Sequence, residues 1–185
     1  MTTPRRVAIL RLNESLRRLP TTTLAAVAPA SLSLEIVEIG QLPLYNQDDD
    51  ATPPAASVAF KEKIASADAV LFVTPEYNRS VPGVLKNAID VGSRPYGKSA
   101  WKGKPAAVMT VSPGKMGGFG ANHHLRQSLV FLDMPAMPQP EAYLGAAGDL
   151  FDDAGGLKKP ETKQFLDKFL AAFAAWIERT AQARA

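Results

Sequence analysis

Short apolar runs rich in branched residues alternate along this chain with longer segments of helical spacing, and this alternation limits the folds open to it. The runs are bounded by turn residues. Stretches such as Ala-Val-Leu-Phe-Val are apolar at consecutive positions, so both faces of the strand are expected to be buried. The pattern predicts an α/β protein with a parallel sheet covered on both faces, a three-layer sandwich. The expected strands are Val7–Leu10, Leu34–Ile39, Ala69–Thr74, Ala106–Val111 and, from a weaker signal, Ala142–Leu144.

The number of expected strands favours one arrangement of the sheet. With 185 residues the chain is the size of one domain, which we expect to span residues 1–185. Five strands fit the flavodoxin-like order 2-1-3-4-5 better than a six-stranded Rossmann sheet. The last helix is expected to start at Pro160 and Glu161 and to pack its apolar stripe into the core. That stripe comprises Phe165, Leu166, Phe169, Leu170, Phe173, Trp176 and Ile177.

Composition excludes several classes of chemistry and location. The chain has no cysteine, so it can form no disulfide or thiolate site, and any redox chemistry must come from a bound cofactor. The net charge is only +3 and the cations are scattered, so we expect no nucleic-acid partner. A short polar start and the absence of a long apolar stretch predict a cytoplasmic protein with no membrane span.

In sheets of this order, ligands bind beyond the carboxyl ends of the strands, where the loops after the first, third and fourth strands converge. The loop after the third strand runs from Thr74 to Gly83 and contains Tyr77 in a tight polar turn. Such a turn can offer backbone N–H groups to the edge of a planar ring. The alternative is an ordinary turn in which Ser80 caps the following helix.

The loop after the fourth strand runs from Ser112 to Gly120 and contains four glycines before a helix expected over Ala121 to Leu132. Glycines at such a junction let the backbone approach a ligand closely, and free N–H groups there can stabilise negative charge. The sequence does not match a phosphate-binding Walker loop or the elbow of a serine hydrolase.

The segment after the first strand, Arg11 to Arg18, contains no glycine. Its arginines and Ser15 could hold a phosphate at the start of a helix through charge-assisted hydrogen bonds. The alternative is a solvated helix face.

Several stretches together resemble the NADPH-dependent FMN reductase family, in particular its chromate/quinone reductase branch. The similarity extends from about Val7 to Leu144 and is most specific in two adjoining motifs. In place of the family's Gly-Ser-Leu-Arg-x-x-Ser loop, the segment after the first strand is shorter and lacks the Gly-Ser pair. The matching stretches are Leu42-Pro43-Leu44-Tyr45-Asn46, Thr74-Pro75-Glu76-Tyr77-Asn78, Ser80-Val81-Pro82-Gly83, Leu85-Lys86-Asn87-Ala88-Ile89-Asp90, Gly117-Gly118 and His124-Leu125-Arg126-Gln127.

The resemblance implies a non-covalently bound FMN, with NADPH or NADH as co-substrate and a quinone, chromate or similar small molecule as electron acceptor. No side chain is expected to act as acid, base or nucleophile, because the flavin carries the chemistry. The implied cofactor-binding residues are Arg11, Asn13, Glu14, Ser15, Leu16 and Arg17 near the phosphate, Pro75, Glu76, Tyr77 and Asn78 along the isoalloxazine, and Ser112, Gly114, Met116, Gly117 and Gly118 on its other side.

Charged residues near these loops have alternative interpretations. Arg79, Lys115 and Arg126 could attract an anionic acceptor, or could be surface or intersubunit charges. No metal site is expected, because His123 and His124 face different directions on a helix and Asp48 to Asp50 lack the spacing of a calcium loop. The resemblance also implies a homo-oligomer, a dimer or a tetramer.

Two other functions remain open from the sequence. A non-enzymatic electron carrier is one, although such carriers tend to be strongly acidic and this chain is basic. The other is a regulatory or scaffold protein that has lost its cofactor, suggested by the atypical segment after the first strand.

Overall fold

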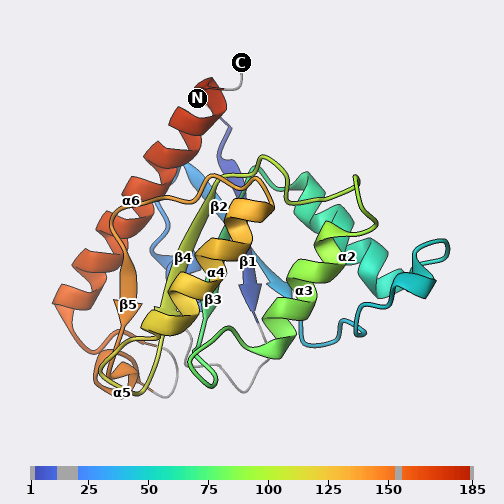
Figure 1. Ribbon diagram of the computed structural model, residues 1–185. Helices are drawn as coiled ribbons and strands as arrows, with labels where there is room; N and C mark the ends of the chain where they lie inside the picture. The colour runs from blue at the N-terminus through green and yellow to red at the C-terminus, as the bar shows by residue number, and fades with distance from the viewer. Residues whose placement is uncertain (1–2, 12–20, 153–155, 184–185) are drawn as a thin grey trace.

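The computed structural model describes residues 3–11, 21–152 and 156–183, without the side chains of Arg11 and Thr22. Its strands form one parallel sheet in the order β2-β1-β3-β4-β5, which confirms the predicted fold (Figure 1). The strands are β1 (Arg5–Arg11), β2 (Leu32–Glu38), β3 (Ala69–Thr74), β4 (Ala106–Val111) and β5 (Ala142–Leu144).

The helices connect these strands as the parallel arrangement requires. The bounds of β1 and β2 differ from the expected Val7–Leu10 and Leu34–Ile39, because backbone pairing extends beyond the apolar runs and β2 ends one residue earlier. Two details of the connections also differ from expectation. The helix after β4 begins at Phe119 rather than Ala121, because Gly118 adopts a left-handed conformation and serves as its N-cap. A single 3-10 turn interrupts the loop expected over residues 47–54, where the Asn46 side chain accepts a hydrogen bond from the Asp48 N–H. The helices are α1 (Thr21–Ala26), η2 (Gln47–Asp49), α2 (Ala55–Ser66), α3 (Gly83–Ser93), α4 (Phe119–Phe131), α5 (Ala147–Leu150) and α6 (Pro160–Gln182).

The sheet separates two hydrophobic layers. Successive side chains along a strand point to opposite faces, so in β3 Leu71 packs with α1 and α6 while Phe72 packs with α2, α3 and α4. In Figure 1, α2, α3 and α4 lie in front of the sheet. Five of the seven residues in the predicted α6 stripe are buried, and Phe165 and Trp176 pack at its margin. The prediction that this stripe is core is therefore confirmed.

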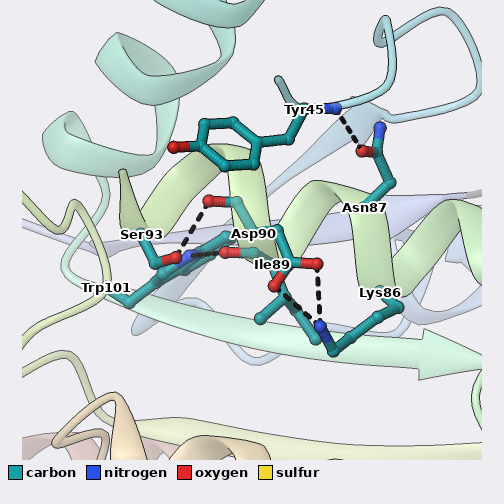
Figure 2. Close-up of polar contacts among 7 residues, drawn as sticks. All are labelled: Tyr45, Lys86, Asn87, Ile89, Asp90, Ser93 and Trp101. Carbon is teal, nitrogen blue, oxygen red and sulfur yellow. Dashed lines mark hydrogen bonds and ion pairs between the residues drawn. The ribbon is translucent and has the colours of Figure 1, made fainter. Parts of the chain in front are cut away.

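Helix α3 is tied to the loop after β2 through one amide side chain. Asn87 Oδ1 accepts a hydrogen bond from the Tyr45 N–H at 2.9 Å (Figure 2). Its Nδ2 donates to the Pro43 carbonyl at 2.9 Å. The Ile89 carbonyl of the same helix accepts a hydrogen bond from the buried Trp101 Nε1 at 2.9 Å. The stretches 42–46 and 85–90 are thus hydrogen-bonded to each other through Asn87.

Candidate functional site

The carboxyl ends of β3 and β4 lie next to each other, with Thr74 opposite Thr110 in the parallel register. The loops that follow these two strands, residues 75–82 and 112–118, therefore leave the same edge of the sheet, at the bottom of Figure 1. The structure thus brings together two of the three loops on which the sequence places the ligand.

The loop after β3 contains a tight two-residue turn. The Tyr77 N–H donates to the Ser80 carbonyl at 3.0 Å, and the Ser80 N–H donates to the Tyr77 carbonyl at 2.9 Å. Between them, Asn78 and Arg79 have left-handed φ values of 50° and 62°. The Tyr77 side chain remains 51% exposed. Because the turn uses the N–H groups of Tyr77 and Ser80, neither of these donors faces a ligand.

Ser80 does not cap helix α3. That helix begins at Gly83, with Pro82 as N-cap and no capping side chain. Instead, Ser80 Oγ lies 2.9 Å from His124 Nδ1 on helix α4. The predicted role of Ser80 as the N-cap of the following helix is therefore wrong.

The glycines after β4 allow a close approach of the backbone. Gly117 has φ of +62°, and a Cβ atom there would lie 2.7 Å from the carbonyl carbon of Tyr143. Gly118 has φ of +80°, and its Cβ would lie 2.8 Å from Thr110 Cβ. Both residues are buried. Only glycine satisfies the sterics and the left-handed backbone at these positions.

The outer part of the same loop is fastened to the segment after β5. The Gly114 N–H donates to Ser112 Oγ at 3.1 Å. The carbonyls of Ser112 and Gly114 accept hydrogen bonds from the N–H groups of Ala147 and Ala146, at 3.1 and 3.2 Å. The Met116 side chain is 68% exposed beyond them. The loop is thus a fixed backbone surface with an apolar side chain at its tip.

The loops after β3 and β4 are joined by a contact that the sequence did not reveal. Glu76 Oε2 accepts a hydrogen bond at 2.9 Å from the N–H of Ala121, in the first turn of α4. A Cβ on Gly120 would lie 2.6 Å from the Arg79 carbonyl oxygen, so this glycine lets the turn pack against the helix. In the sequence, this packing could have been suggested by Gly120, the fourth glycine of its loop.

A group of aromatic residues adjoins the glycine loop. The ring of Phe119 lies 4.3 Å from that of His123 and 5.6 Å from that of Tyr143. The Tyr143 hydroxyl donates to Glu141 Oε1 at 2.8 Å and lies 3.2 Å from His123 Nε2. Burial, aided by the hydrogen bond to Glu141, raises the pKa of Tyr143 to about 12. The phenol therefore stays neutral over the physiological pH range.

The two adjacent histidines face different partners, as expected from their positions on a helix. His123 contacts Tyr143, whereas His124 contacts Ser80. Within residues 3–11, 21–152 and 156–183, no group of three or more histidine, aspartate or glutamate side chains is placed to hold a metal ion.

The segment predicted to bind the phosphate follows β1. Asn13, Glu14, Ser15, Leu16 and Arg17 lie outside the described residues. Arg11 is the last residue of β1 and pairs in register with Glu38, so its backbone reaches the same edge as the two loops.

The described part of this edge presents backbone and exposed apolar side chains from two loops. Gly117 and Gly118 hold one loop against Tyr143 and Thr110, and the exposed Tyr77 and Met116 side chains stand at the two loops. Binding at this edge is typical of doubly wound sheets.

Comparison with known proteins identifies the family to which the chain belongs. Residues 9–149 match the model of the family described as NADPH-dependent FMN reductase. The chain is 63% identical over 166 residues to a quinone reductase of Pseudomonas putida, covering 89% of each chain. It is 47% identical over 154 residues to a 2-hydroxy-1,4-benzoquinone reductase of a Burkholderia species, covering 83% of this chain and 84% of the other. Among solved structures, it resembles FerB, a flavoenzyme NAD(P)H:(acceptor) oxidoreductase of Paracoccus denitrificans, with a TM-score of 0.87, 39% identity and coverage of 95% and 98%.

The chain belongs to the NADPH-dependent FMN reductase family. This confirms the resemblance seen in the sequence, and with it the expected class of enzyme, an FMN-dependent oxidoreductase that uses NAD(P)H.

Gly117→Ala is expected to weaken FMN binding by roughly tenfold or more and to lower the free energy of unfolding by about 1–3 kcal/mol. The added Cβ would meet the Tyr143 backbone at 2.7 Å in a left-handed conformation. Fluorescence titration of the apoprotein with FMN and urea unfolding would measure the two effects. Gly148→Ala, in α5, is the comparison, because its Cβ would meet nothing within 4 Å. Equal FMN affinity in Gly117→Ala and the unmodified protein would contradict a role for the glycine loop in binding FMN.

Proposed function

We propose that the edge formed by the loops after β3 and β4 holds the isoalloxazine of FMN, with residues 75–78 along one side and residues 112–118 along the other. The observation that carries the proposal is the fixed glycine loop after β4 at the same edge as the exposed Tyr77: Gly117 and Gly118 hold this loop in left-handed backbone against Tyr143 and Thr110. We assign the phosphate to the segment after β1, through Ser15, Arg17 and Arg11, with Asn13, Glu14 and Leu16 beside them.

When held between these loops, FMN would supply the two-electron redox chemistry that links NAD(P)H to the second substrate. The protein would hold the cofactor in position and provide its electrostatic environment. The fixed backbone after β4 supplies dipoles close to the ligand, and dipoles held in place before the reaction need no reorganisation during it. The neutral phenol of Tyr143 adds no negative charge beside this loop.

Quinones are the acceptor class that we propose, because relatives at 63% and 47% identity are named as quinone reductases. We extend the proposal to anionic acceptors such as chromate on the basis of two exposed cations. Arg79 lies at the tip of the turn after β3, and Lys115 lies in the loop after β4. Arg126 is a weaker candidate, because its Nε donates to Asn122 Oδ1 at 2.8 Å and its Nη1 to the Met137 carbonyl at 3.0 Å.

The purified protein with FMN bound is expected to lose its visible absorbance when NADPH or NADH is added without oxygen, and to regain it when a quinone is added. Because both substrates would use the same exposed face in turn, initial rates should follow ping-pong kinetics. Stopped-flow absorbance and initial-rate measurements test this. Reduction that requires a partner protein would instead favour an electron carrier, and a protein that takes up no FMN would favour the scaffold alternative.

Arg79→Ala is expected to raise the KM for chromate by roughly threefold or more while leaving the KM for a neutral quinone unchanged, because only the anion is attracted by the guanidinium. Lys168→Ala, which removes an exposed cation from α6, is the matched control. An unchanged chromate KM in Arg79→Ala would remove this residue from the site.

We propose that the protein acts in the cytoplasm as a homo-oligomer, a dimer or a tetramer. None of the helices in the described part of the chain is long and apolar enough to cross a membrane. Support for self-association comes from the end of α4, where Val130 and Phe131 are 80% and 78% exposed. Apolar side chains left exposed side by side are more typical of an interface than of a free surface.

Phe131→Asp is expected to lower the mass measured by sedimentation equilibrium, because a carboxylate would be buried in the proposed interface. Val58→Asp, which alters an exposed apolar residue on α2, is the control. An unmodified protein with the mass of one chain would rule out the oligomer. An unchanged oligomer in Phe131→Asp would exclude this face.

A further inference from the structure

The first turn of α4 has no capping side chain of its own. Its N-cap is Gly118, which cannot accept a hydrogen bond through a side chain. The N–H groups of Phe119 and Asn122 donate to the carbonyls of Met116 and Gly118, at 3.3 and 3.1 Å. The N–H of Ala121 points instead to Glu76 Oε2, at 2.9 Å. A carboxylate from the loop after β3 therefore caps the helix that follows β4.

Two further contacts join the same parts. Ser80 Oγ lies 2.9 Å from His124 Nδ1, one helical turn along α4. Gly120 lies so close to the Arg79 carbonyl that an added Cβ would be 2.6 Å from its oxygen. Glu76, Arg79 and Ser80 span the whole turn after β3. The turn is thus docked on the first two turns of α4 through Glu76, Arg79 and Ser80.

We propose that Glu76 is a positioning residue of the flavin site, whose carboxylate acts through α4 and does not itself bind the cofactor. By joining the loop after β3 to the helix that follows the glycine loop, it makes the two walls of the site a single unit. The inference rests on the proposed placement of FMN between these loops. It changes the role expected for Glu76, whose carboxylate is engaged with the helix.

Two interactions stabilise the contact between the Glu76 carboxylate and the N–H of Ala121. A carboxylate at a helix N-terminus combines a charge-assisted hydrogen bond with a favourable interaction with the helix dipole. Glu76 is partly buried, so solvent screens the interaction less than at the surface. The contact lies between residues 45 positions apart, so it fixes tertiary geometry and not only local helix structure.

The experiment compares Glu76→Ala, which removes the acceptor, with Glu76→Gln, which keeps an oxygen at the same reach and removes the charge. Glu161→Gln is the matched control, because Glu161 is an exposed carboxylate in the first turn of another helix, α6. Hydrogen exchange is followed in the apoproteins, in peptides covering residues 76–82 and 119–125. FMN affinity and the visible spectrum of bound FMN are measured in parallel.

In Glu76→Ala both peptides are expected to exchange faster, FMN affinity to fall by roughly tenfold, and the spectrum of bound FMN to shift toward that of free FMN. Glu76→Gln should restore part of each property, because an acceptor oxygen remains while the charge is lost, and Glu161→Gln should change none. Unchanged exchange over residues 119–125 in Glu76→Ala would overturn the proposal. So would a loss of FMN affinity in Glu76→Gln as large as in Glu76→Ala without faster exchange in Glu76→Gln, because the carboxylate would then act on the cofactor and not through α4.

The exchange measurement needs no cofactor, so it separates this inference from the proposed function. If faster exchange in Glu76→Ala joins the two peptides but FMN affinity is unaffected, the loops are coupled and the placement of FMN between them is wrong. That outcome would overturn the positioning role.

Discussion

Burial of the central strands on both faces is the constraint on which the rest of this structure depends. Every residue of β3 and β4 is buried. A strand enclosed in this way has no room for an exposed polar side chain, so the polar groups of the molecule's centre must lie beyond the strand ends. The polar exceptions in these two strands support this. Thr74 Oγ1 donates to the Pro75 carbonyl, and Thr110 Oγ1 donates to the Ala142 carbonyl. Both therefore serve the backbone at the edge that carries the site.

Burial on both faces also explains which parts of the fold could be predicted from the sequence. The bounds of β3, β4 and β5 were predicted correctly, because a run of apolar side chains starts and stops where burial does. The first strand extends beyond its apolar run to Arg5 and Arg11, where only the backbone pairs with β2. Helix α4 begins early because of a left-handed glycine. Hydrophobic patterns report side-chain environment, and these extensions depend on the backbone.

Part of the candidate site could likewise be predicted from the sequence, and part could not. Glycines at a strand-to-helix junction could be read from the sequence, since few other residues allow such a backbone. The role of Glu76 could not, because its partner is the N–H of Ala121, and a backbone group carries no residue-specific signal. The pairing of Asn87 with residues 43 and 45 was hidden for the same reason. In each case a polar side chain binds the backbone of a distant segment, and only the tertiary structure shows which segment that is.

The turn after β3 shows why such long-range contacts are needed. Left-handed backbone at a residue other than glycine costs about 1–2 kcal/mol, and the turn holds two such residues, Asn78 and Arg79. Its two cross-turn hydrogen bonds contribute only about 0.5–1.5 kcal/mol each. These contributions roughly cancel, so the turn is not stable in this shape by itself.

A hydrogen bond to a charged group contributes about 1.5–3 kcal/mol, and the one between Glu76 and Ala121 is therefore large enough to decide the conformation of the turn. The shape of one wall of the site is thus set by the helix that carries the other.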